Sequence, residues 1–175
     1  MTSHVVLLRA VNVGGAKLPM AELRELATDL GATDVSTFIA SGNLLCDPPK
    51  DVKAFGTALE QAIEKKYGFF RECIIRTATE LAKARKVYPF DVDDPKNGHI
   101  AFLLEKPTKA AIAKAREIET GADRWEVIGR EWHICYDHGA GRSDMKTAAI
   151  GKALGVPSTS RNLRTVDQLI ELSSE

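Results

Sequence analysis

The sequence predicts an α+β protein in which one order of strands and helices occurs twice. Apolar runs of strand length open both halves of the chain, and stretches with helical spacing follow them at matching places. Between the halves lies the segment 88–98, which combines two prolines, a glycine and an acidic run. We therefore expect a first unit over residues 1–90, a linker over 91–98 and a second unit over 99–175.

The first half is predicted to contain alternating strands and helices that end on a helix. Apolar runs and turn signals indicate strands at 4–8, 35–41, 43–47 and 70–76. Apolar residues at helical spacing predict helices at 19–31, 51–68 and 77–87. The last of these helices opens with Thr77 and Glu80 at capping-box spacing, where each side chain can accept a free backbone N–H of the first turn.

The second half follows the same plan. Strands are predicted at 99–105, 123–129, 130–136 and 157–162. Helices are predicted at 106–121, 144–155 and 165–173, and the last opens with Thr165 and Gln168 at the spacing of Thr77 and Glu80. Each half is thus β-α-β-β-α-β plus a helix, which is the ferredoxin-like plan of an antiparallel sheet with helices on one face. Two tandem units of this kind can pack as a pseudo-dimer.

Composition excludes some functional classes. Lys and Arg together equal Asp and Glu at 24 each, so no overall charge draws the chain to nucleic acid or to an anionic membrane. No apolar run approaches the ~18 residues of a membrane span, and the first residues lack the basic region of a signal peptide. The three cysteines, Cys46, Cys73 and Cys135, are odd in number and widely spaced, which indicates free thiols and a cytoplasmic location.

The loop after the first strand has the composition of an anion-binding loop. It contains Arg9, Asn12, Gly14, Gly15 and Lys17. Glycines let backbone N–H groups approach a ligand closely, the following helix offers an electropositive N-terminus, and the cations attract a phosphate or carboxylate. The spacing is not that of a P-loop. The alternative interpretation is a flexible loop with a solvated lysine and a surface arginine.

Two further loops differ between the halves. The first hairpin turns through Ser41 to Asn43, where Gly and Asn favour an ordinary tight turn, and a ligand contact is the alternative. The second half inserts a glycine-rich segment that ends in Arg142 and Ser143 ahead of a helix. Ser143 or Asp144 is a candidate helix cap, and Arg142 beside glycines is a candidate anion contact.

Arg161 and Asn162 stand just ahead of the last helix. Arg9, Arg142 and Arg161 could converge on one anionic ligand. The competing interpretation is three separate surface arginines with capping or ion-pair roles.

Metal and nucleophile chemistry receive little support. His133 and Cys135 share a face of a strand and His138 follows, yet no further ligand pattern completes a metal site, so an ordinary strand is favoured. The cysteines have apolar neighbours that indicate buried, inert thiols. Trp125 and Trp132 are interpreted as core or inter-half packing residues. We expect no metal and no cofactor, and we assign no catalytic residue.

Residues 7–47 and 141–169 resemble a known bacterial family. The first stretch carries L-R-x-V-N-V-G-G, P-M-x-x-L and I-x-S-G-N. The second carries G-R-S and then T-x-R-N-x-x-T-V-x-x-L, which begins at Thr159. Together they are similar to the family called domain of unknown function 1697. Ala10 and Leu163 depart from its pattern, which has Gly and commonly Trp there. The resemblance implies tandem ferredoxin-related units and supplies no activity, substrate or catalytic residue.

The family's motif positions coincide largely with the loops singled out above. They fall on Arg9, Asn12, Gly14, Gly15, Pro19, Met20, Ser41, Gly42, Asn43, Arg142, Ser143, Arg161, Asn162 and Thr165.

These observations support a hypothesis of function and two alternatives. The first is a pocket for a small anionic ligand, such as a phosphate or nucleotide, at the junction of the halves, with or without turnover. Arg9, Lys17, Arg142 and Arg161 would supply charge. The second is a non-enzymatic interaction module that associates through its sheet faces, for which a homodimer would speak. The third and weakest is nucleic-acid binding, which needs a coherent basic face despite zero net charge. The sequence does not decide whether the protein is an enzyme.

Overall fold

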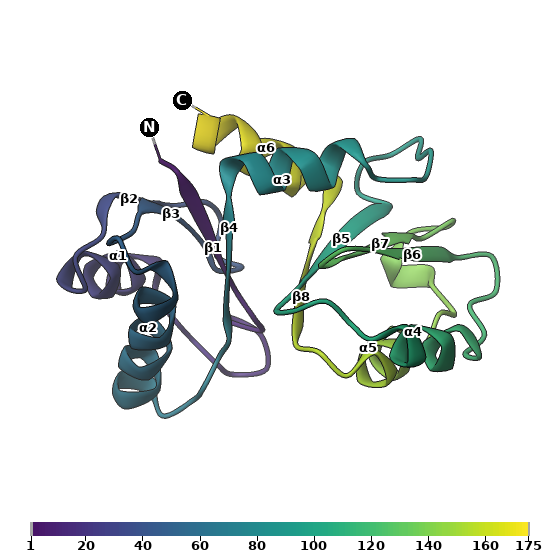
Figure 1. The fold of residues 1–175 in the computed structure, drawn as a ribbon, viewed down its shortest axis with the longest axis horizontal. Coiled ribbons are helices and arrows are strands. Elements are labelled where there is room, and N and C mark those ends of the chain that lie inside the picture. Colours follow the sequence, from purple (N-terminus) through teal and green to yellow (C-terminus); the bar gives the residue numbers. More distant parts are fainter. Residues whose placement is uncertain (1, 175) are drawn as a thin grey trace. The chain divides into compact units, whose positions relative to one another are not determined.

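The computed structural model describes residues 2–174, which divide into two compact units (Figure 1). Unit 1 is the chain up to Ala82 together with the stretch from Gln168 onward, and unit 2 is Lys83–Asp167. Helices α3 (Ala78–Lys86) and α6 (Leu163–Ser174) each begin in one unit and end in the other. The boundaries expected at residues 90 and 99 stay a prediction.

Unit 1 contains a four-stranded antiparallel sheet with the strand order β2-β3-β1-β4. Two helices, α1 and α2, cover one face of this sheet (Figure 1). The elements are β1 (His4–Leu8), α1 (Met20–Asp29), β2 (Thr33–Thr37), β3 (Asn43–Asp47), α2 (Val52–Tyr67) and β4 (Cys73–Thr77).

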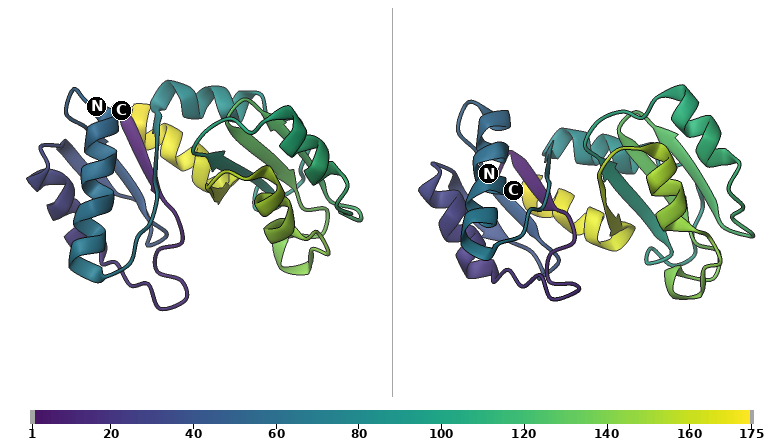
Figure 2. Two further views of the ribbon diagram at one scale, coloured as in Figure 1. Left: turned by 60° about the horizontal axis from the view of Figure 1, so that its bottom comes forward. Right: turned by 90° about the horizontal axis from the view of Figure 1, so that it is seen from below.

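Unit 2 repeats this topology with the strand order β6-β7-β5-β8 (Figure 2). Its elements are β5 (Gly98–Leu103), α4 (Lys109–Arg116), β6 (Arg124–Ile128), β7 (Glu131–Cys135), the 3-10 turn η1 (Ala140–Arg142), α5 (Thr147–Leu154) and β8 (Ser158–Asn162). The predicted α+β class with two tandem ferredoxin-like units is confirmed. Among residues 2–174, no helix combines the length and the apolar character that a membrane crossing requires.

Each unit has its own apolar core between its sheet and its helices. In unit 1, Leu8 of β1 and Leu23 of α1 are fully buried with Leu59 of α2. In unit 2, Trp125 and Trp132 lie in the core with their rings edge to face at 6.2 Å, which confirms the interpretation of both tryptophans as packing residues. Full burial of one such leucine is worth about 1.5–3 kcal/mol, so these faces fix the strand register.

In both units the last strand turns directly into a helix. The Thr77 N–H donates to Glu80 Oε2 at 2.8 Å and the Glu80 N–H donates to Thr77 Oγ1 at 3.0 Å, so the predicted capping box is confirmed. The corresponding cap of α6 is Asn162, whose Oδ1 accepts the Thr165 N–H at 2.9 Å. The prediction of a cap at Thr165 is wrong, because Asn162 pairs with His99 as Thr77 pairs with His4.

Several predicted elements are longer than the observed ones, and polar side chains account for the differences. The strand predicted at 35–41 ends at Thr37, because the Asn43 side-chain amide donates a hydrogen bond to the Phe38 carbonyl at 2.9 Å. The helix predicted from residue 144 begins at Thr147, since Ser143 Oγ accepts the Met145 N–H at 3.0 Å and holds an irregular turn there. The prediction of a helix cap at Ser143 or Asp144 is therefore wrong, because the N-cap residue of α5 is Lys146.

One prediction concerns His133 on β7, which is 0% exposed and whose ring nitrogens have no hydrogen-bond partner. Burial lowers the pKa of His133 from 6.5 to about 4, so the folded protein holds the ring neutral. In the unfolded chain this histidine binds a proton near pH 6.5. Above that pH the ring is neutral in both states, so its full contribution to the free energy of unfolding is present there. This contribution should fall as the pH drops and level off below about 4, with a total loss on the order of 3 kcal/mol.

Urea denaturation at a series of pH values would measure this loss. His133→Leu should reduce the slope of the profile between pH 6.5 and 4, and the remaining slope includes that of His99, whose pKa burial also lowers. His138→Gln is the matched control, because the His138 side chain is 74% exposed. Identical slopes for the wild type and His133→Leu would contradict the assignment.

Candidate functional site

The structure brings two of the sequence-predicted loops together at one end of the sheet in unit 1. We call residues 9–18 and 38–42 the loop cluster. The Leu8 N–H donates to the Gly42 carbonyl at 2.9 Å, and the Asn12 amide donates to the Ala40 carbonyl at 2.5 Å. The segment before β4 also contacts the loop cluster, because Arg71 Nε donates to the Ala10 carbonyl at 3.1 Å.

Two asparagines at this end of the sheet, Asn12 in the loop cluster and Asn43 at the start of β3, form hydrogen bonds within the chain. The Asn12 amide also donates to the Leu18 carbonyl at 3.1 Å, and its oxygen accepts the Leu18 N–H at 2.9 Å. Asn43 is 0% exposed and donates to Ser41 Oγ at 3.0 Å as well as to the Phe38 carbonyl. These contacts explain the asparagine at both positions, because each side chain holds the neighbouring loop in its conformation. A ligand contact at Asn12, Ser41 or Asn43 stays a prediction.

Glycine is required in the loop cluster for two different reasons. Gly14 and Gly15 have φ of +57° and +86°, and no atom lies within 4 Å of the place where a Cβ would stand. Backbone conformation alone selects glycine there. At Gly42, with φ of +87°, a Cβ would lie 2.5 Å from Val11 Cγ2. Close packing of the hairpin against the first loop therefore adds to the conformational requirement.

The cations of the loop cluster are on the surface. Arg9 is exposed and pairs with Glu72 through Nη1 and Oε1 at 3.4 Å. Lys17 is exposed as well. An exposed pair of this kind is worth about 0–1 kcal/mol, so Glu72 would compete only weakly with a ligand for Arg9.

In unit 2, the structure connects Ser143 to a buried carboxylate. Ser143 Oγ donates to Asp123 Oδ2, and the Asp137 N–H donates to Asp123 Oδ1 at 2.8 Å. Asp123 is 6% exposed. The segment that carries the exposed Arg142 is thereby fastened to the residue that precedes β6.

Arg161 has a counterpart in unit 1 that sequence comparison missed. Arg161 pairs with Ile100 on β5, and Arg76 pairs with Val5 on β1, at equivalent positions of the two sheets. Both arginines are buried, and each donates from Nη1 to the carbonyl of the preceding residue, at 2.9 Å in Arg161 and 3.1 Å in Arg76. Arg161 also donates to Thr159 Oγ1 at 2.6 Å.

Burial lowers the pKa of Arg161 to about 10, which still leaves the guanidinium charged at neutral pH. Because both repeats have a buried arginine at this position, a role in folding accounts for Arg161. The ligand-binding role expected for Arg161, and for Asn162 beside it, stays a prediction.

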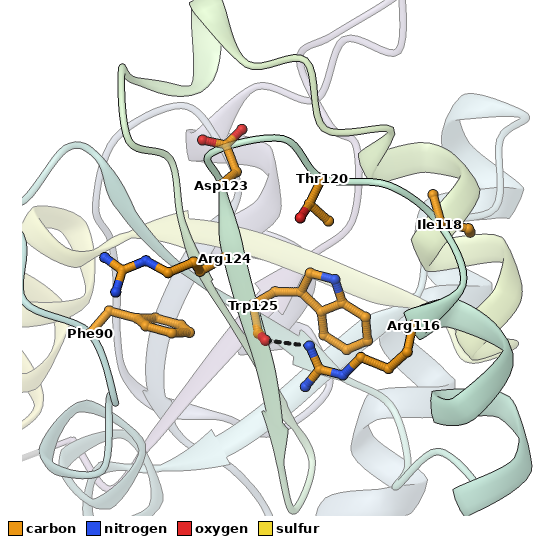
Figure 3. Close-up of a pocket in the computed structure, with 7 residues that line it drawn as sticks. All are labelled: Phe90, Arg116, Ile118, Thr120, Asp123, Arg124 and Trp125. Atoms are coloured by element: carbon orange, nitrogen blue, oxygen red, sulfur yellow. Dashed lines mark hydrogen bonds between the residues drawn. The ribbon is translucent and has the colours of Figure 1, made fainter.

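The larger hollow of unit 2 lies where sequence reasoning placed no site. It has a volume of about 330 Å³, within the range of about 300–1,000 Å³ that is usual for ligand pockets. Figure 3 shows Arg124 beside Phe90 and Arg116 beside Trp125. The lining residues are Phe90, Arg116, Ile118, Thr120, Asp123, Arg124 and Trp125.

Local contacts hold both arginines of this hollow. The Arg116 guanidinium stacks 3.7 Å from the centroid of the Trp125 ring, donates to the Trp125 carbonyl at 2.7 Å and pairs with Glu126 at 2.9 Å. The Arg124 guanidinium lies 5.1 Å from the centroid of the Phe90 ring and 3.5 Å from Cys135 Sγ. A ring and a thiol orient Arg124 without neutralising its charge.

A second, smaller hollow of about 90 Å³ adjoins the first at Arg124, which lines both. Three aspartates, Asp91, Asp93 and Asp137, are among the residues that line this smaller hollow. In the sequence, Asp91 and Asp93 belong to an acidic run typical of a solvated loop, and Arg116 and Arg124 match no motif. The one available signal was the direct succession of Asp123, Arg124 and Trp125 at the start of a strand.

The three cysteines are free and buried, which confirms the prediction from their spacing. Within residues 2–174, no group of three or more His, Cys, Asp or Glu side chains is arranged to hold a metal ion.

Comparison with known proteins identifies the family. Residues 1–133 match the family described as "Protein of unknown function (DUF1697)", and the chain belongs to that family. The resemblance drawn from the sequence motifs is thereby confirmed. No curated protein matches the chain.

A solved structure shares the fold. It is titled "The structure of conserved bacterial protein SP0830 from Streptococcus pneumoniae" and is 22% identical in sequence, with a TM-score of 0.71. The match covers 100% of this chain and 99% of that one. At this identity the comparison supports the architecture over the whole length of the chain.

A second prediction tests the packing of the loop cluster. Gly42→Ala should lower the free energy of unfolding by about 3 kcal/mol or more, because a left-handed alanine costs about 1–2 kcal/mol and the clash with Val11 adds to it. Gly14→Ala, where φ is also positive but the space is open, should cost only about 1–2 kcal/mol. Denaturant titration of both variants gives the comparison. Equal losses would contradict the close-packing argument.

A third prediction tests the bond between Ser143 and Asp123. Ser143→Ala removes one donor to a buried carboxylate and the acceptor of the Met145 N–H, so it should cost about 1–3 kcal/mol. Amide hydrogen exchange should accelerate at Met145 and Asp137. Ser160→Ala, at an exposed serine of the same unit, is the control. Unchanged exchange in Ser143→Ala would show that the bond does not hold the segment.

Proposed function

We propose that the protein binds a small anionic ligand, such as a phosphate or a carboxylate, in the larger hollow of unit 2. The observation that carries this proposal is Arg124, an exposed residue that lines the hollow and whose guanidinium contacts the Phe90 ring and the Cys135 thiol. A guanidinium that is already oriented loses little rotamer freedom when it forms two parallel hydrogen bonds to an oxyanion. Arg116 adds a second positive group to the lining.

The lining also contains one carboxylate, that of Asp123, which the protein itself holds in place. Both oxygens of Asp123 accept hydrogen bonds from the protein itself, from Ser143 and from the Asp137 backbone. Thr120 supplies a hydroxyl, and Ile118 and Phe90 supply apolar surface. This mixture of apolar walls and a few polar groups is usual in small-molecule sites.

The ligand class is the one that the sequence analysis expected, whereas the location differs. A pocket built from Arg9, Lys17, Arg142 and Arg161 at the junction of the halves stays a separate prediction. Arg142 belongs to both hypotheses, because Ser143 fastens its segment to Asp123. The proposal concerns binding and assigns no turnover.

The fourth prediction is that small anions stabilise the protein through Arg124. A thermal-shift screen against inorganic phosphate, sugar phosphates, nucleotides and organic acids should find compounds that raise the midpoint of unfolding, since a ligand at a hundred times its Kd stabilises by about 2.7 kcal/mol. Arg124→Gln should abolish the rise.

Arg164→Gln is the matched control, since Arg164 is an exposed arginine of unit 2 outside the hollow. Arg9→Ala separates the two locations, because Arg9 belongs only to the site expected from the sequence. A rise that survives Arg124→Gln and disappears in Arg9→Ala would overturn the proposal and support the sequence-based site.

A further inference from the structure

Strand β6 forms one edge of the sheet in unit 2, and its pairing with β7 is continuous. Its five residues pair one to one with those of β7. Strand β2 is the equivalent edge in unit 1, where a register shift between Thr33 and Ser36 interrupts the pairing with β3. Irregular edges of that kind discourage the addition of a further strand, whereas a regular edge such as β6 is a template for one.

The backbone groups of Trp125 and Val127 point outward from this edge. The Tyr136 N–H donates to the Asn97 carbonyl, and bonded pairs recur at every second residue of an antiparallel pair, so Ile134 directs its backbone groups toward β5. Trp125 lies opposite Ile134 and therefore directs its N–H and C=O away from β7. The same holds for Val127, two residues further along β6.

Two arginines flank the start of this edge. The Arg116 guanidinium donates to the Trp125 carbonyl at 2.7 Å, which agrees with the outward direction of that carbonyl. Figure 3 shows Arg116 on one side of β6 and Arg124 on the other, and both line the larger hollow. The hollow thus lies at the amino end of the edge strand, beside outward backbone groups.

From this arrangement, in an inference that rests on the proposed function, we infer that the bound anion is the terminal carboxylate of an extended peptide that adds to β6 as an antiparallel strand. The carboxyl end of an antiparallel partner lies beside the amino end of β6, which carries Arg124. The carboxylate accepts the Trp125 N–H and meets Arg124, and the residue two positions earlier pairs with Val127. A carbonyl oxygen accepts two hydrogen bonds, so Trp125 keeps its bond from Arg116.

The hollow favours an apolar side chain on the last residue of such a peptide. Residues directly opposite each other in an antiparallel pair have their side chains on the same face, so this side chain lies on the face of Trp125. Ile118 packs on the same core as Trp125 and is half-buried. The volume of about 330 Å³ is larger than a carboxylate needs and leaves room for the side chain.

The test compares a peptide with its amide. The peptide is acetyl-Ser-Thr-Ser-Thr-Val with a free terminal carboxylate, and the control has the same sequence with a terminal amide. NMR titration at equal ionic strength should give a Kd about fivefold or more lower for the acid, because a charged acceptor strengthens its hydrogen bonds to arginine. The acid should also bind about tenfold or more tightly than acetate, since main-chain hydrogen bonds add to the affinity.

Amide hydrogen exchange locates the peptide on the edge. Exchange at Trp125 and Val127 should slow when the acid peptide binds, because their N–H groups then donate to it. Exchange at Glu126 should stay unchanged, since its N–H points toward β7. N-methylation of the third peptide residue, whose N–H faces Val127, should abolish the slowing and weaken binding. N-methylation of the fourth residue, whose N–H faces away from β6, should do neither.

Variants of the protein assign the two kinds of contact. Arg124→Gln should remove the difference between the acid and the amide, and Arg164→Gln, at an exposed arginine outside the hollow, should keep it. Val127→Pro removes an outward N–H and no bond to β7, which an edge strand tolerates. It should weaken binding of the peptide and leave binding of acetate unchanged.

The outcomes separate peptide recognition from anion binding. If acetate or phosphate binds through Arg124 and the acid peptide has no advantage over its amide, the inference is overturned and the proposed function stays in place. Peptide binding without slower exchange at Trp125 and Val127, or equal effects of the two N-methylations, would also overturn the inference. If acetate, phosphate and the acid peptide all fail to bind, both the proposed function at this hollow and the inference fall.

Discussion

The fold depends on a constraint that both repeats share, which is that the last strand of each sheet becomes a helix without an intervening loop. The residue that ends the strand also caps the helix, Thr77 in one repeat and Asn162 in the other. A side chain that accepts an N–H of the first helical turn fixes the direction of that helix relative to the strand. The preceding residue is a buried arginine in both repeats, Arg76 and Arg161, with its guanidinium on the carbonyl before it.

This constraint explains why Arg161 of the family motif, which the sequence suggests as a ligand-binding residue, is a buried residue of the sheet. In the sequence, Arg161 and Asn162 stand between two turn-rich stretches and suggest a ligand loop. In the sheet they occupy the end of β8, where the buried Arg161 guanidinium donates hydrogen bonds to acceptors of its own strand. The proposed anion site is therefore built on Arg124 and not on Arg161.

How far the sequence could predict the structure is best judged from particular residues. The strand and helix order was predictable, because period-two and helical patterns report directly on which faces are buried. The Thr77–Glu80 cap was predictable because it is local, whereas Asn162 was missed since the second repeat carries another threonine, Thr165, one turn later. The hollow was not predictable, because Phe90, Arg116 and Arg124 come from three separate segments and only the sheet brings them together. The contact of Asn12 with Ala40 was missed for the same reason.

The division of the chain has a consequence for synthesis on the ribosome. Unit 1 starts at the first strand yet takes its last helical stretch from Gln168 onward. Nascent domains usually fold in order of emergence. Here the earlier-made unit stays incomplete until the codons from Gln168 onward are translated, while unit 2, a single continuous stretch, has all of its residues sooner. The later-encoded unit is thus the first that can complete its fold.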